Sequence, residues 1–344
     1  MVSRWLRPLA AVAAAGALLV AVPVAVAGRA ASAPRLQPLP ADRLVASVAA
    51  ALAAEPSLQG ELAARVDLGL PSLAGVPGAS GDQFASFFGD HRLRLWSSPD
   101  GHRLADLLPA AERSLVAGRD GAWAWDSSSF TAWRLADGPA VRAVDALDPS
   151  RLLGLVDPLA LARRSLAALD PSTAVSVAAG ARVAGRPAYV LRLVPRTRET
   201  LVGRVEVAVD AARRVPLRVA VYARGAAKPA VQAAFTRVRF GPVDPATFSF
   251  RPPPGATIRR PGLPKEPPGR APEYLPRTFG SGWATVVALP LPGSARPSPE
   301  LTALLPFSGP LFSARLAVRG EDRWLLYGAV PQAALVAAEA KLPS

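Results

Sequence analysis

The stretch that decides the fold runs from Ala184 to Phe250, and it begins AGRPAYVLRLVPR (184–196) and continues GRVEVAVDAARRVPLRVAVYARG (203–225). Hydrophobic and charged residues alternate along it, which is typical of antiparallel strands with one buried and one solvent-exposed face. The reversals between the runs predict four short strands. The hydrophobic positions that share the buried face are Tyr189, Leu191, Leu193, Val205, Val207, Val209, Leu217, Val219 and Val221.

The N-terminus predicts the compartment. Arg4 and Arg7 precede an uncharged run from Leu9 to Ala27, and small residues follow. This is the pattern of a secretory signal. An uncleaved membrane anchor is the alternative, because the run comes close to the length of a bilayer span. Residues 1–33 are therefore expected to be a signal peptide or an N-terminal anchor, and the rest is expected in the periplasm or cell envelope.

Composition excludes several kinds of chemistry. The 344 residues include no cysteine, which rules out disulfides, thiolate metal sites and a lipoprotein lipobox. The net charge is +14, from 40 Lys and Arg against 26 Asp and Glu. Basic charge of this kind is compatible with contact to an anionic membrane surface. The arginines are spread over strands instead of clustering in one helix, so no nucleic-acid partner is expected.

Earlier segments extend the same sheet. Helices are expected at 42–55, with Asp42 as its N-cap, at 149–156 and at 158–169, with Asp157 as N-cap and Pro158 at the first position. LQGELAARVDLGLP predicts a long strand, and Ser-Pro-Asp-Gly (98–101) predicts a hairpin. The predicted fold class is α+β, with a strongly curved antiparallel sheet, or half-barrel, and helices on its concave face.

Helices on a concave sheet would enclose an apolar space. An acyl chain needs apolar walls with few polar anchors. Ordinary core packing explains the same residues equally simply, and both interpretations stay open. The expected lining residues are Val66, Leu68, Leu70, Leu93, Leu95, Trp123, Trp125, Tyr189, Leu191, Val207 and Val219.

Several passages carry a family resemblance. These are LQGELAARVDLGLP, DGAWAWDSSSFTAWRL, VAGRPAYVLRLVPR, VEVAVDAARRVPLRVAVYARG and FTRVRFGPVDPATFSFRPPPGA. Over roughly 44–256 the chain resembles the LolA-like and MucB/RseB-like superfamily, which contains outer-membrane lipoprotein carriers and periplasmic sigma-factor regulators. The resemblance implies a half-open β-barrel that binds lipid or lipoprotein acyl chains in residues 41–254.

The C-terminal part resembles the regulators more than the simple carriers. A proline-rich linker is expected at 255–276, followed at 277–344 by a small α+β domain whose Gly328–Pro331 step leads into a last helix. The RseB-like regulators have a similar small domain, and the simple carriers lack it. This resemblance implies a membrane anti-sigma factor as a partner.

Enzymatic signatures are sparse. His91 and His102 lie near Asp90 and Asp100 at the ends of one predicted hairpin, where a divalent metal could bind, but polar hairpin ends are the simpler interpretation. The sequence contains no nucleophile elbow and no phosphate-binding glycine loop. No enzyme activity, cofactor or metal is expected. Three functions stay open: a lipid or lipoprotein carrier, an envelope-stress regulator that senses lipid, and a structural cell-surface interaction protein.

Overall fold

The computed structural model describes residues 36–69, 89–108, 110–137, 156–260, 276–291, 302, 305–320 and 322–343. The expected signal or anchor, 1–33, lies outside these ranges. So does the expected helix 149–156, apart from its last residue. None of the described helices is long and apolar enough to cross a membrane.

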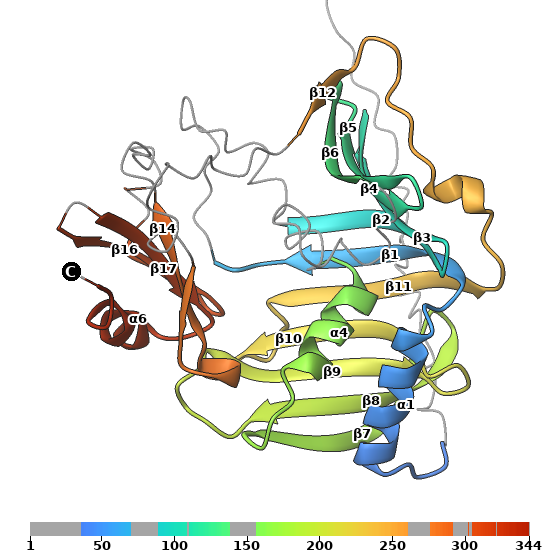
Figure 1. The fold of residues 1–344 in the computed structure, drawn as a ribbon. Coiled ribbons are helices and arrows are strands. Elements are labelled where there is room, and N and C mark those ends of the chain that lie inside the picture. Colours follow the sequence, from blue (N-terminus) through green and yellow to red (C-terminus); the bar gives the residue numbers. More distant parts are fainter. Residues whose placement is uncertain are drawn as a thin grey trace, which may run out of the picture. The chain divides into compact units, whose positions relative to one another are not determined.

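A twelve-stranded sheet forms most of the described structure (Figure 1). Its strand order is β12-β6-β5-β4-β3-β2-β1-β11-β10-β9-β8-β7, and every pair except parallel β12–β6 is antiparallel. The strands are β1 (Leu58–Val66), β2 (Gly89–Ser98), β3 (Gly101–Leu108), β4 (Ala111–Gly118), β5 (Gly121–Asp126), β6 (Thr131–Asp137), β7 (Thr173–Val183), β8 (Arg186–Pro195), β9 (Val202–Asp210), β10 (Pro216–Ala223), β11 (Val231–Phe240) and β12 (Thr257–Arg259).

The four strands predicted from the deciding stretch are β8 to β11. Their hydrophobic positions are buried as expected except Val221, which is half-buried. Val207, Leu191 and Val219 are neighbours across three strands and have no exposed surface. Glu206 lies on the opposite face, which the alternation predicts to be solvent-exposed, yet its side chain is buried. Arg204, Arg192 and Arg218 reach it at 3.1, 3.3 and 3.8 Å and cover its carboxylate.

Two helices cover the inner face of this sheet, which is the face of Leu191 and Val207. Helix α1 (Ala41–Ala53) packs on β7 and β8, and α4 (Pro158–Ala167) packs on β10 and β11 (Figure 1). The predicted Asp42 cap is wrong, since Pro40 is the N-cap of α1 and provides no side-chain bond. The predicted Asp157 cap is confirmed, because its carboxylate accepts the Leu159 N–H at 2.8 Å.

A second, five-stranded sheet contains the C-terminal residues, in the order β13-β14-β17-β16-β15. Its core is formed by Trp324, Leu326, Val330 and Leu335, which are almost completely buried. The predicted α+β class, with one strongly curved sheet and a small second unit, is confirmed. The elements are β13 (Arg277–Phe279), β14 (Val286–Leu291), β15 (Phe307–Ser308), β16 (Ser313–Arg319), β17 (Asp322–Gly328) and α6 (Gln332–Glu339), with short 3₁₀ turns at Pro245–Phe248 and Gly282–Ala284.

The boundary between the two sheets differs in detail from the expected linker. Residues 257–259 lie inside the proline-rich stretch, yet they form β12 beside β6 in the large sheet. Hydrogen bonds also connect the sheets: Leu201 N and Thr200 Oγ1 each donate to Ala329 O at 2.8 Å, and Trp283 Nε1 donates to Thr173 Oγ1 at 2.7 Å. The domain boundaries predicted at residues 254 and 276 therefore stay a prediction.

Candidate ligand-binding face

Seven of the eleven predicted lining residues belong to one buried cluster on the inner face. The cluster includes Leu44 and Val48 from α1 and Leu159 from α4, so the residues beneath these helices are packed core. Tyr189 extends to its margin, where its hydroxyl donates to Gln37 O at 3.0 Å. The seven residues are Val66, Leu93, Leu95, Tyr189, Leu191, Val207 and Val219.

The other four residues lie elsewhere or are partly exposed. Leu68 is half-buried and packs against the cluster. Leu70 is outside the described residues. Trp123 and Trp125 are separated from the set by strand register: Leu95 pairs with Leu104, which pairs with Leu115, which pairs with Ala124. Because neighbours along a strand point to opposite faces, the tryptophans flanking Ala124 lie on the outer face.

The tryptophans have their own partners there. Their ring centroids lie 5.7 Å (Trp123) and 5.9 Å (Trp125) from the ring of Phe250, and Trp125 also meets Phe130 at 5.4 Å. They belong to a small aromatic cluster on the outer face. Trp123 and Trp125 are therefore removed from the residues proposed to line the ligand site.

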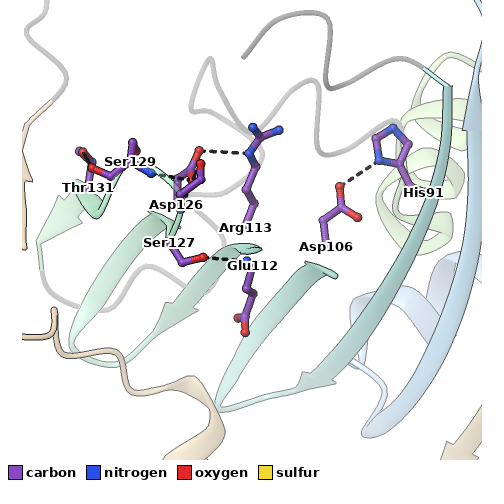
Figure 2. Close-up of polar contacts among 9 residues, drawn as sticks. His91, Asp106, Glu112, Arg113, Asp126, Ser127, Ser129 and Thr131 are labelled. Carbon is purple, nitrogen blue, oxygen red and sulfur yellow. Dashed lines mark hydrogen bonds and ion pairs between the residues drawn. The ribbon is translucent and has the colours of Figure 1, made fainter. Parts of the chain in front are cut away.

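A row of polar side chains crosses the inner face, and the sequence analysis did not identify it. His91, Asp106, Arg113, Asp126 and Thr131 follow one another on β2 to β6 (Figure 2). His91 Nδ1 lies 2.9 Å from Asp106 Oδ2, and Arg113 Nε donates to Asp126 Oδ2 at 3.1 Å. We call these five residues the polar row. Leu93 pairs with Asp106, so the polar row shares its face with Leu93, Leu95, Leu104 and Leu115.

Electrostatics keep Asp126 of the polar row charged. Burial alone would raise the pKa of Asp126, but hydrogen bonds from the Ser128 side chain and backbone, together with Arg113, hold that pKa below its usual value. Asp126 is therefore an anion beside a guanidinium in a largely buried setting. Both can orient a polar group, since charge-assisted hydrogen bonds are the strong ones.

The second histidine connects the sheet to α4. His102 Nε2 lies 3.0 Å from Asp157 Oδ2, so β3 is attached to the N-terminus of the helix. The metal interpretation of the histidines does not match this geometry, since their partners are Asp106 and Asp157 and not Asp90 and Asp100. Among the described residues, no group of three or more His, Cys, Asp or Glu side chains is placed to hold a metal ion.

Comparison with known proteins yields similarities of fold. No family model matches the sequence, and no curated protein matches it. The crystal structure of MucB matches with 18% identity over 86% of this chain and 94% of that chain, at a TM-score of 0.47. The MucA/MucB complex of Pseudomonas aeruginosa matches with 17% identity over 87% and 96%, at 0.45.

A LolA-superfamily protein of Nitrosomonas europaea matches with 14% identity over 62% of this chain and 99% of that chain, at a TM-score of 0.24. Solved structures of the superfamily that the sequence resembles are thus among those matched, and the similarity is one of fold. What these proteins bind is not carried over to this chain by similarity at this level.

Proposed function

We propose that this chain is an exported, non-enzymatic binding protein that holds the acyl chain of a lipid or lipoprotein against the inner face of the large sheet. The observation that supports this proposal is the direct junction, on one face, of leucines and the polar row. An amphiphile needs such a junction, because its chain requires apolar contact and its head requires fixed polar groups.

The proposed site lies over β2 to β5, where Leu93, Leu95 and Leu104 continue the buried cluster that is packed under α1 and α4. Leu93, Leu95, Leu104 and Leu115 are almost fully buried, so a ligand can reach them only if a covering segment moves. The His102–Asp157 contact is one place where such a movement would begin, because it attaches α4 to β3.

Native mass spectrometry tests the proposal on protein isolated from its own cell envelope, with lipid extraction of the same sample. We expect bound amphiphile in the natural chain. Arg113→Leu should retain roughly 10- to 150-fold less of it, since a charge-assisted hydrogen bond contributes about 1.5–3 kcal/mol.

The matched control is Arg103→Leu. Arg103 lies on the outer face and pairs with Glu112 at 3.3 Å, so this variant loses the same charge without touching the polar row. Melting temperatures of both variants separate loss of ligand from loss of fold. Absence of any amphiphile in the natural protein, or equal retention by the two variants, would contradict the proposal.

The regulator alternative has a different supporting observation. The second sheet carries exposed hydrophobic side chains, Val318 on β16 at 57% and Val336 on α6 at 48%. An exposed aliphatic side chain can provide one point of contact with another protein, and single exposed residues are also common on protein surfaces. In this alternative, the second sheet binds the extracytoplasmic part of a membrane anti-sigma factor while the large sheet senses lipid.

A pull-down from the native envelope distinguishes the alternatives. Val318→Asp with Val336→Asp should lose a membrane-protein partner while keeping any bound lipid. The control is Ile258→Asp, which changes a residue that is 59% exposed on β12 of the large sheet. Retrieval of the same partner by all variants would show that these valines do not bind it.

A further inference from the structure

The outer face of the large sheet has a basic surface that the proposed ligand site does not use. We call it the basic outer face and define it by Arg92 and Arg94 on β2, Arg237 and Arg239 on β11, and Glu61 on β1 between them. Glu61 pairs in register with both Arg94 and Arg237. Two hollows of about 650 and 320 Å³ lie here, and both are lined by Glu61 and Arg94.

Positive charge on this face is poorly compensated. The titratable side chains that line the two hollows are four arginines and one glutamate. Glu61 is engaged by Arg237 at 2.9 Å. Arg92 and Arg94 are exposed, and neither forms an ion pair within the part of the chain that the structure describes. Elsewhere on the outer face, by contrast, three arginines converge on Glu206 and are tied to it.

Hydrophobic groups stand among these arginines. Leu107 is 40% exposed and lines the smaller hollow. Trp96 is half-buried and lines the larger one, with the Arg103 guanidinium 5.8 Å from its ring centroid. A purely ionic partner would gain nothing from an exposed leucine. Arginine beside tryptophan and leucine suits a membrane interface, where charges meet headgroups and apolar groups reach the acyl boundary.

We propose that the basic outer face docks the protein on a membrane surface that carries anionic phospholipid headgroups. This site is separate from the inner face, so it does not depend on the proposed function. The two faces would act together: the protein rests on the membrane by its outer face while an amphiphile occupies its inner face.

A single fluorescent label tests the orientation of docking. The chain contains no cysteine, so Leu107→Cys provides one attachment point for a polarity-sensitive dye on the protein isolated from its envelope. We expect a blue shift with vesicles of phosphatidylcholine mixed with phosphatidylglycerol, no shift with phosphatidylcholine alone, and reversal by salt. The same dye at Val318→Cys, in the second sheet, should not shift, even if residues 1–33 anchor the chain.

Charge variants then test the arginines. In the labelled protein, Arg92→Gln with Arg94→Gln should raise the lipid concentration for half-maximal shift by roughly thirtyfold, since each basic residue near an anionic surface contributes about 1 kcal/mol. The matched control is Arg43→Gln with Arg119→Gln, two exposed arginines outside this face whose loss lowers the net charge equally. The control should bind like the parent.

Several results would overturn the proposal. They are an equal shift with phosphatidylcholine alone, an equal shift of the dye at Val318→Cys, and equal weakening by both pairs of substitutions. A shift produced by soluble polyglutamate and not by vesicles would instead assign the face to an acidic polypeptide. All the substituted arginines except Arg119 lack a described ion-pair partner and all are exposed, so the variants are expected to melt like the parent, which calorimetry checks.

Discussion

Asp157→Ala is expected to lower the free energy of unfolding by about 2–4 kcal/mol, because it removes the N-cap of α4 and leaves the largely buried His102 ring without its hydrogen-bond partner. The carboxylate has two roles: it caps α4 through the Leu159 N–H at 2.8 Å and it holds His102 at 3.0 Å. Both are lost in alanine. Chemical denaturation measures the effect, provided that the slope of the unfolding free energy against denaturant concentration is the same for the variant and the parent.

Asp157→Asn is the matched control, because asparagine caps helices nearly as well but carries no charge. It should keep the cap and lose only the carboxylate contact with His102, so its loss of stability should be smaller than that of the alanine variant. Equal stability of the alanine variant and the parent would show that the attachment of α4 to β3 contributes nothing to the fold.

Acid titration examines the same group. Burial by itself would raise the pKa of Asp157, but the hydrogen bond and charge of His102, the Leu159 N–H and the charge of Arg163 hold it below the usual value. A carboxylate with a lowered folded-state pKa stabilises the protein above its unfolded-state pKa of about 4, and this contribution is lost as the pH falls through the folded-state pKa. The stability difference between parent and Asp157→Asn should therefore shrink in acid. A difference that grew as the pH fell below about 4 would contradict the assignment.

Leu191→Ala is expected to cost about 2–5 kcal/mol of unfolding free energy, because Leu191 is completely buried and its neighbours cannot fully close the space. This prediction also separates core from ligand-binding surface. A residue that lined an open cavity would lose fewer packing contacts, and its truncation would change ligand retention more than stability.

Leu107→Ala is the control for this substitution. The same atoms are removed from a leucine that is 40% exposed, and surface substitutions usually change stability by less than about 0.5 kcal/mol. If the two variants lost equal stability, Leu191 would not be part of the core. Retained stability of Leu191→Ala with loss of bound amphiphile would extend the proposed site beneath α1 and α4.

Alternation within a strand was enough to predict much of the inner face. Leu191, Val207 and Val219 are buried because period-two spacing puts them on one side of β8, β9 and β10, whatever the neighbouring strands do. Local chemistry also predicted the cap of α4, because the Asp157 carboxylate accepts a hydrogen bond from a backbone N–H only two residues further along the chain. These features depend on nearby residues, which is why the sequence could reveal them.

The tryptophans show where that reasoning fails. Trp123 and Trp125 do share a face, but which face depends on the pairing of β2 with β3, β3 with β4 and β4 with β5. A shift of one residue in any of these registers would move both rings to the other side. The polar row was missed for the same reason: its five residues come from five strands, and no sequence spacing joins them.

By itself, the sequence determined the antiparallel meander, its buried positions, the cap of α4 and the absence of thiol chemistry, because each follows from composition or from residues close together in the chain. The tertiary structure alone decided which strand faces coincide. It thereby placed His91 against Asp106 and Arg113 against Asp126 beside the inner leucines, buried Glu206 beneath three arginines, and left Arg92 and Arg94 exposed on the opposite side. Register and long-range pairing fix those relations, and neither is encoded in local periodicity.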